Sequence, residues 1–209
     1  MVPDNLRPNP QGDRPQVDPT ACVDPTARLI GRVRVGPRAF VGPGAVLRAD
    51  EAGPGGAVEA VDIGAECNVQ DGVIIHALGG SGVTVGPRTS LAHGCVVHGP
   101  CMVGEGCFVG FRAVVFKAVL EAGVMVGAAA VVQGVTLKAG ALVPPGRVVV
   151  SSEQTWALGM AGDAERHFMA EVVETNLALA DGYRAQGGAG GAAGAGADAA
   201  DGVDAGGGP

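Results

Sequence analysis

The sequence predicts an all-β fold, a left-handed parallel β-helix of hexapeptide repeats, with a C-terminal α-helix packed alongside. An aliphatic residue recurs every six positions through most of the chain, and glycine often follows it, as in "VGPRAF" and "VGEGCF". Glycine relieves the steric cost of a corner conformation. Each repeat therefore predicts a short strand and a corner, and three repeats make one coil of a triangular prism whose coils pair at about 4.8 Å.

The repeat places the main domain at residues 21–150, after a proline-rich N-terminal arm of residues 1–20. The aliphatic residues stand at 23, 29, 35, 41 and 47, at 63, 69 and 75, and then regularly from 85 to 149, with two intervals shortened to five. An elastin-like, low-complexity chain is the alternative for repeated "VG", but so many aliphatics in one register argue against it. Longer intervals after Leu47 and Ile75 predict two loops, and loops on a rigid scaffold commonly carry function.

A linker and a C-terminal helix are expected in residues 151–186. Apolar residues at three-to-four spacing predict an amphipathic helix that lies against the prism; they are Phe168, Met169, Val172, Val173, Leu177, Leu179 and Ala180. His167 falls in the same pattern and is expected as a helix-face residue. Residues 187–209 are almost entirely Gly, Ala and Asp, which predicts a disordered tail.

The composition excludes several classes of partner. The net charge of −7 leaves no basic surface for a nucleic acid. No apolar run approaches membrane-spanning length and no basic segment precedes one, so we expect no membrane association and a cytoplasmic location. The five cysteines form no CxxC pair. Those at 67, 95, 101 and 107 stand four places after an aliphatic, where small side chains face inward, so we expect them to be packing residues.

Three histidines can be placed by the register. His76 follows Ile75 and His98 follows Val97, three repeats and one four-residue insertion later, so the two stack on adjacent coils. Imidazoles at this separation suit one ion with metal–nitrogen distances of about 2.0–2.1 Å. His93 lies one face back, and joining all three from a single chain looks strained. We therefore predict metal sites between the subunits of a homotrimer, where His93 of one chain faces His76 and His98 of its neighbour.

The histidine pattern leaves alternatives. A histidine at a β-helix corner is ordinarily a solvated surface residue, and in hexapeptide acyltransferases a single histidine acts as general base without a metal. Asp71 stacks one coil from His93 and is expected to orient or neighbour it. Three neutral imidazoles leave the fourth zinc position open for water, whose pKa then falls toward about 7. This chemistry favours hydration of a small electrophile such as CO₂.

Several motifs resemble the γ-class carbonic anhydrases: "RADEAG", "NVQDGVIIHAL", "SLAHGCVVHGP", "FVGFRAVVFKAVLEAG" and "GVTLKAGALVPPGRVVVSS". The resemblance covers residues 20–184. It implies a lyase that hydrates CO₂ reversibly to bicarbonate with a metal-bound hydroxide, in a homotrimer of left-handed β-helices. Zn²⁺, or in some members Fe²⁺ or Co²⁺, would lie between subunits, with His76 and His98 of one chain and His93 of the next as ligands.

The resemblance also implies roles for five other residues. Gln70 would hydrogen-bond the metal-bound hydroxide, and Asn176 would bind CO₂ or bicarbonate. Arg48 and Asp50 match a pair that contacts substrate and bridges subunits, with a trimer salt bridge as the alternative role. Glu51 matches a glutamate implicated in proton transfer, with a solvated loop charge as the alternative.

The sequence departs from the prototype of this family at two positions. Gly79 stands where a glutamate shuttles protons, and Glu174 replaces a tyrosine near the asparagine. Proton transfer is then expected to be slow or to depend on Glu51 or buffer. Two alternative functions therefore remain: a weakly active, metal-binding trimeric scaffold of the same family, as in carboxysome proteins, and a hexapeptide acyltransferase or thioesterase.

Overall fold

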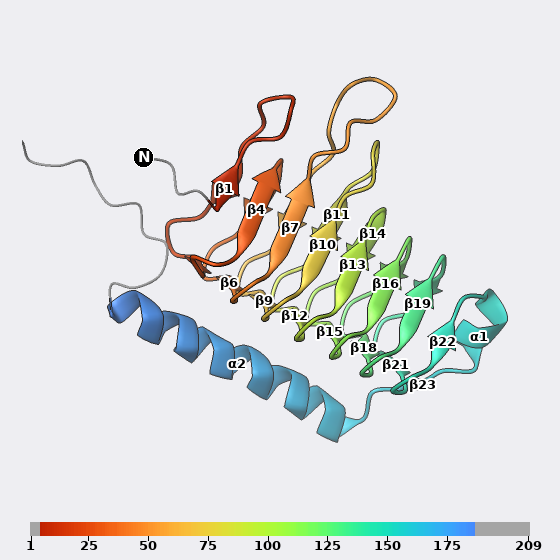
Figure 1. Ribbon diagram of the computed structural model, residues 1–209. Helices are drawn as coiled ribbons and strands as arrows, with labels where there is room; N and C mark the ends of the chain where they lie inside the picture. The colour runs from red at the N-terminus through yellow and green to blue at the C-terminus, as the bar shows by residue number, and fades with distance from the viewer. Residues whose placement is uncertain (1–4, 187–209) are drawn as a thin grey trace, which may run out of the picture.

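The protein is a parallel β-helix with three sheets and a long helix along one side (Figure 1). A computed structural model describes residues 5–186. It confirms the predicted fold class. The tail expected to be disordered, residues 187–209, lies outside the described residues.

Each sheet takes one strand from every coil. Sheet A contains, in spatial order, β1 (Leu6–Arg7), β4 (Arg28–Gly31), β7 (Val46–Ala49), β10 (Ile74–His76), β13 (Val96–His98), β16 (Val114–Phe116), β19 (Val131–Gln133) and β22 (Val148–Val149). Sheet B contains β2 (Gln16–Val17), β5 (Val33–Val35), β8 (Val61–Ile63), β11 (Val83–Val85), β14 (Cys101–Val103), β17 (Val119–Leu120) and β20 (Thr136–Leu137). Sheet C contains β3 (Cys22–Val23), β6 (Phe40–Val41), β9 (Asn68–Val69), β12 (Ser90–Leu91), β15 (Phe108–Val109), β18 (Met125–Val126), β21 (Ala141–Val143) and, antiparallel to β21, β23 (Gly159–Met160).

The strand register follows the aliphatic repeat. In sheet A, Leu47 pairs with Leu29 on one side and with Ile75 on the other, and Ile75 pairs with Val97.

The longer coils contain the two expected loops, residues 50–60 and 77–82. An antiparallel bridge between Ala52 and Val58 closes the first loop into a hairpin. Both loops leave the prism immediately after a strand of sheet A, so they lie beside the end of that sheet.

The interior of the prism is narrow and apolar. The repeated aliphatics and the small residues four places later are buried together in one continuous core. All five cysteines are buried free thiols. Burial raises the pKa of the Cys95 thiol to about 12, so it is a packing group rather than a nucleophile.

The first coil begins inside the expected N-terminal arm. β1 pairs with β4, and β2 pairs with β5, so residues 6–17 already extend sheets A and B. The loop between these strands hides the six-residue spacing in the sequence. Asn9 holds this loop in place, because its side-chain amide donates to Asp13 Oδ2 at 2.9 Å and to the Ala49 carbonyl at 3.2 Å.

After the last coil the chain forms α1 (Ser152–Trp156), β23 and α2 (Asp163–Ala185), and α2 packs across β3, β6, β9 and β12 of sheet C. The buried stripe of α2 is Met169, Val173, Leu177 and Ala180. Two of the seven residues predicted for this face, Phe168 and Leu179, are exposed, because a helical period of about 3.6 residues carries them to the edges of the stripe. Neither α1 nor α2 is long and apolar enough to cross a lipid bilayer.

Candidate metal centre

His76 and His98 lie side by side at the ends of β10 and β13. They are direct partners in the parallel ladder, and Arg48 is the partner of His76 on the other side. His76 Nδ1 lies 3.0 Å from His98 Nε2, and the two rings meet edge to face with their centroids 4.8 Å apart. Two nitrogens bound to one tetrahedral zinc ion would lie about 3.3 Å apart, given metal–nitrogen distances near 2.05 Å. The pair therefore fits two positions of a metal site.

The hydrogen-bond partners of this pair determine which ring nitrogen of each histidine carries a proton. A guanidinium can only donate, so Arg48 Nη2, 3.0 Å away, requires His76 Nε2 to be an acceptor. The proton of His76 then lies on Nδ1 and is donated to His98 Nε2, while His98 Nδ1 donates to the Gly99 carbonyl at 3.2 Å. Burial lowers the pKa of His76, and Arg48 acts in the same direction. Burial and Arg48 thus favour the neutral form of His76, and its Nδ1 proton, which faces His98 Nε2, is the one that a metal ion would displace.

Two carboxylates approach the same histidine from the loop of residues 50–60. Glu51 Oε1 lies 3.3 Å from His76 Nε2, and its other oxygen accepts the Gly79 backbone N–H at 3.2 Å. Asp50 Oδ1 lies 3.5 Å from Arg48 Nε and 3.6 Å from His76 Nε2, and this buried oxygen lacks a hydrogen-bond partner among residues 5–186. Glu51 therefore ties the two loops together beside the histidine.

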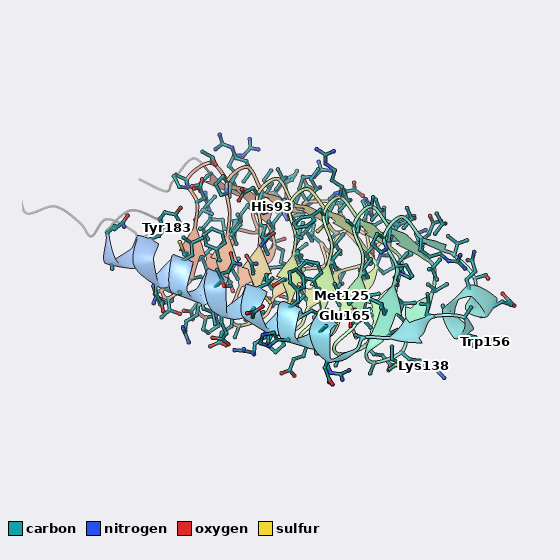
Figure 2. The ribbon with its side chains drawn as sticks, turned by 90° about the horizontal axis from the view of Figure 1, so that it is seen from below. His93, Met125, Lys138, Trp156, Glu165 and Tyr183 are labelled. Atoms are coloured by element: carbon teal, nitrogen blue, oxygen red, sulfur yellow. The ribbon has the colours of Figure 1, made fainter. Side chains whose placement is uncertain are left out.

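His93 lies elsewhere, in the turn that joins sheet C to sheet A (Figure 2). Its side chain is 53% exposed, and Nδ1 lies 3.5 Å from Asp71 Oδ2. Its backbone N–H donates to Gln70 Oε1 at 3.2 Å. The Phe111 ring stacks on the imidazole with centroids 5.8 Å apart and planes 7° apart. Asp71, His93 and Phe111 thus form a column on three successive coils.

The predicted residues separate into two groups within one chain. The histidine-pair half-site contains Arg48, Asp50, Glu51, His76 and His98, and the His93 half-site contains Gln70, Asp71 and His93. In the described part of a single chain, no three His, Cys, Asp or Glu side chains gather closely enough to hold a metal ion. Asn176 lies on α2, half-buried, and its side-chain amide donates to the Val172 carbonyl at 2.8 Å.

Two notable residues near the His93 half-site escaped the sequence analysis. Phe111 stands eighteen residues after His93, one full coil, so the register arithmetic could have found it. Asn68 stands two residues before Gln70 and is 1% exposed. Neither polar atom of its side chain finds a hydrogen-bond partner in the part of the chain that is described. The sequence feature that could have drawn attention to Asn68 is an amide side chain at a repeat position that Phe40 and Phe108 occupy in other coils.

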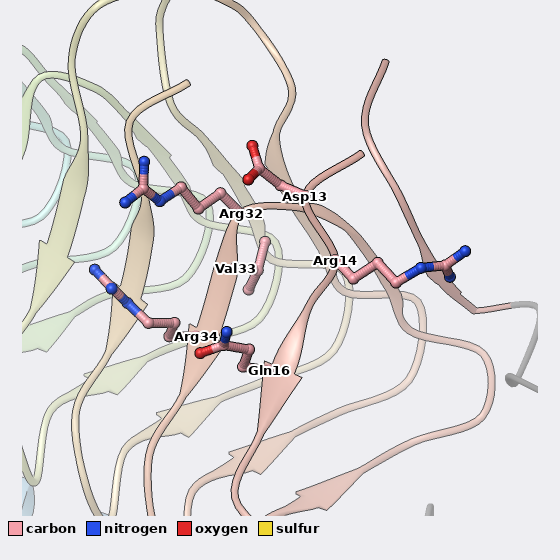
Figure 3. A pocket seen from close by; sticks show the side chains of 6 residues that line it. All are labelled: Asp13, Arg14, Gln16, Arg32, Val33 and Arg34. Atoms are coloured by element: carbon pink, nitrogen blue, oxygen red, sulfur yellow. The ribbon is translucent and has the colours of Figure 1, made fainter. Parts of the chain in front are cut away.

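A polar pocket lies against the first coils of the prism (Figure 3). It is lined by Asp13, Arg14, Gln16, Arg32, Val33 and Arg34. The Arg34 guanidinium is already paired with Asp62, and Arg32 Nη1 donates to the Val58 carbonyl at 3.0 Å. This pocket contains none of the predicted site residues.

Comparison with known proteins identifies relatives of this chain. No family model matches the chain. The chain is 35% identical over 197 residues to a carbonic anhydrase from Methanosarcina thermophila, and the match covers 84% of this chain and 77% of that protein. It is also 35% identical over 150 residues to a carboxysome assembly protein from Nostoc, covering 67% of this chain. The chain therefore spans only 26% of the length of that carboxysome protein.

The solved structures show the same architecture. A hexapeptide transferase family protein from Anaplasma phagocytophilum superposes with a TM-score of 0.71 at 30% identity, covering 85% of this chain and 97% of that one. The Methanosarcina enzyme is 35% identical over most of both chains, whereas the match to the carboxysome protein covers a quarter of that protein and the transferase-family structure is 30% identical. The chain therefore belongs to the γ-class carbonic anhydrase family.

Proposed function

We propose that the protein is a metal-dependent carbonic anhydrase that hydrates CO₂ reversibly to bicarbonate at sites between the subunits of a homotrimer. The observation that supports this most is the separation of the ligands: His76 and His98 form a pair on sheet A, while His93 lies exposed at the corner between sheets C and A. Each chain then offers two ligands to one neighbour and a third to the other. Closed threefold symmetry turns these halves into three equivalent sites.

The outer face of sheet A is suited to receive a second copy. From β7 to β22, one outward position of sheet A carries a β-branched apolar residue on every strand, beside the histidine pair, while β4 carries Arg28 there. The six residues are Val46, Ile74, Val96, Val114, Val131 and Val148. Ile74 is 45% exposed and Val148 is 49% exposed in the single chain. A contiguous apolar column of this kind marks an interaction surface. The column lies beside His76 and His98, so a subunit that packs on the column would also bury the metal site.

The residues of both halves have distinct roles in this proposal. A bound Zn²⁺, or Fe²⁺ or Co²⁺ in its place, would supply the nucleophile by acidifying water near neutral pH. Gln70 arrives with His93 of the neighbouring chain and hydrogen-bonds the attacking oxygen. Arg48 and Asp50 bind substrate at the interface, and Asn176 binds CO₂ or bicarbonate.

Proton release is assigned to Glu51. Its carboxylate lies 3.3 Å from His76 Nε2 and its side chain is 43% exposed, so it touches the site and reaches solvent. Gly79 offers no second carboxylate at this point. Glu51 then passes the proton to buffer, and we expect the hydration rate to depend on buffer concentration.

Subunit mixing tests the interfacial site directly. Neither His76→Ala nor His93→Ala alone can form a complete site. In a mixed trimer one intact site forms, where an unaltered His76–His98 pair meets an unaltered His93. Random one-to-one assembly should therefore restore about a quarter of the wild-type metal content and CO₂ hydration rate. Stopped-flow hydration and metal analysis measure both quantities.

Three results would count against the proposal. Sites contained within one chain would give no recovery on mixing. Full metal retention and an unchanged rate in His93→Ala alone would remove His93 from the site. A wild-type protein that is fully metal-loaded but shows no hydration above buffer would exclude the enzyme and support the second candidate, an assembly protein. The 35% identity to the carboxysome assembly protein favours that second candidate.

We also propose a cytoplasmic location. All five cysteines are free thiols, as is usual in a reducing compartment. Cell fractionation tests this location.

A further inference from the structure

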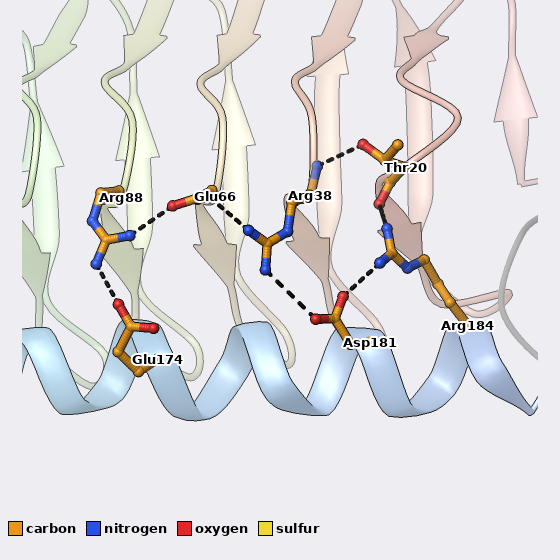
Figure 4. A network of polar contacts seen from close by, with 7 residues as sticks. All are labelled: Thr20, Arg38, Glu66, Arg88, Glu174, Asp181 and Arg184. Carbon is orange, nitrogen blue, oxygen red and sulfur yellow. Dashed lines mark hydrogen bonds and ion pairs between the residues drawn. The ribbon is translucent and has the colours of Figure 1, made fainter.

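A row of charged residues connects the prism to α2 (Figure 4). Arg38, Glu66 and Arg88 occupy the same corner, between sheets B and C, on three successive coils, and we name them the corner ladder. Glu66 accepts from Arg38 Nη1 at 2.9 Å and from Arg88 Nη1 at 2.6 Å. The ladder reaches α2 at two points: Arg88 Nη2 lies 2.5 Å from Glu174 Oε1, and Arg38 Nη2 lies 3.5 Å from Asp181 Oδ2.

The backbone at these three positions shows that the charges are retained against a local cost. Arg38, Glu66 and Arg88 have φ values of 54°, 58° and 54°, in the left-handed region where side chains are strained. The next three coils carry Gly106, Gly123 and Gly140 at the same corner. A Cβ built on Gly106, on the coil next to Arg88, would meet nothing within 4 Å, so lack of space does not explain why glycine replaces a charged residue at that position. The charges stand where α2 presents Glu174 and Asp181.

Helix geometry connects this contact to Asn176. Glu174 and Asp181 are seven residues apart, about two turns, and so share one flank of α2. Asn176 lies two residues after Glu174, about 200° around the helix, on the other flank of the buried stripe. The strands of sheet C run from the corner ladder toward Gln70 and His93. Since α2 crosses these strands, its second flank faces the corner that carries the His93 half-site.

We propose that the corner ladder, together with Glu174 and Asp181, is a clasp that fixes the rotation of α2 about its axis and thereby positions Asn176 toward the His93 half-site. The role of Asn176 in substrate binding belongs to the proposed function, and this inference rests on it. Arg88 and Glu174 are then positioning residues that act through Asn176. Arg184 supports the same flank, because its guanidinium contacts Asp181 Oδ1 and the Thr20 carbonyl, each at 2.5 Å.

The test uses the full-length, metal-loaded protein with Glu174→Gln and Arg88→Gly. Glycine relieves the strained corner, so Arg88→Gly removes the Arg88–Glu174 contact of the clasp without threatening the fold. Glu171→Gln is the matched control, since within residues 5–186 Glu171 pairs with His167 on the same helix and not with the prism. Amide hydrogen exchange along α2 should be about two- to fivefold faster in both clasp variants than in the control. The KM for CO₂ should rise by a similar factor with unchanged metal content.

A second background separates positioning from general destabilisation. In Asn176→Ala protein the clasp variants should cause no further rise in KM, because the residue through which they act is gone. Equal α2 exchange in the clasp variants and the control would overturn the proposal. So would a KM effect that persists undiminished in the Asn176→Ala background. If the metal-loaded wild type shows no hydration at all, the proposed function fails, and the exchange comparison alone decides whether the clasp exists.

Discussion

His93 is held in place although more than half of its side chain is exposed. Asp71 Oδ2 faces Nδ1, Phe111 covers one face of the ring, and Gln70 accepts the backbone N–H. Asp71 lies on the Nδ1 side of the imidazole, so a proton on Nδ1 directed to its carboxylate would leave Nε2 available as a ligand. Such preorganisation would lower the entropic cost of capturing a metal ion across the proposed interface.

Replacing Asp71 with Asn should weaken metal binding by about tenfold, because an outer partner that fixes the ligand tautomer is lost. Competition with a chromogenic chelator measures the affinity. Asp62→Asn is the matched control, since that carboxylate pairs with Arg34 on sheet B. Equal affinity in the two variants, with the oligomeric state unchanged, would show that Asp71 does not orient His93.

The pairing of His76 with His98 could be predicted from sequence, because the register of a repeat fixes strand partners. The same arithmetic would have paired Arg48 with His76 across the coil that contains the first loop. The position of Glu51 could not be predicted in this way. It depends on the conformation of the two loops, where the repeat is absent and hydrogen bonds such as Glu51 to Gly79 decide the geometry.

At the scale of elements, the three sheets differ in what covers them. Sheet C lies under α2, with Phe108 and Ala92 packed against Met169. The helical pattern predicted that a helix would pack on the prism. It did not predict which sheet the helix covers, because that depends on the outward residues of all the strands in a sheet taken together. Within residues 5–186, no helix covers the apolar column of sheet A. That difference supports sheet A as the face that meets another subunit.

A charge on this column should prevent assembly. Ile74→Lys places an ammonium group in the proposed interface, so we expect trimers to dissociate to monomers and metal to be lost while the circular dichroism of the β-helix is retained. Light scattering after size exclusion measures the mass. Met102→Lys is the control, because Met102 is 55% exposed on sheet B. Trimers that survive Ile74→Lys with metal bound would place the interface on another face.

At the scale of the whole molecule, stability depends on one continuous core that runs the length of the prism. Each coil buries its aliphatics against the coils on both sides, so no coil has a separate core. Four thiols lie within this core, at Cys67, Cys95, Cys101 and Cys107, and burial raises the pKa of each. For three of them the rise is large: the pKa of Cys67 and of Cys107 rises to about 11 and that of Cys95 to about 12, from an ordinary value of 9.0. The free energy of unfolding therefore depends on pH through these thiols, in addition to the contribution of the apolar side chains.

The fold should lose stability above about pH 9. The folded state keeps these three thiols protonated while the unfolded chain releases their protons, so their contribution is intact below pH 9 and is lost as the pH rises toward 11 or 12. Each thiol can lower the free energy of unfolding by up to about 1.4 kcal/mol per pH unit in this range.

Urea unfolding of the wild type and of the triple variant Cys67→Ala, Cys95→Ala, Cys107→Ala at pH 8, 9 and 10 measures the effect. Alanine already occupies the same repeat position at Ala39 and Ala113, so the variant should fold and show the shallower decline. Because every other titrating group is common to both proteins, parallel declines would show that the buried thiols do not control alkaline stability.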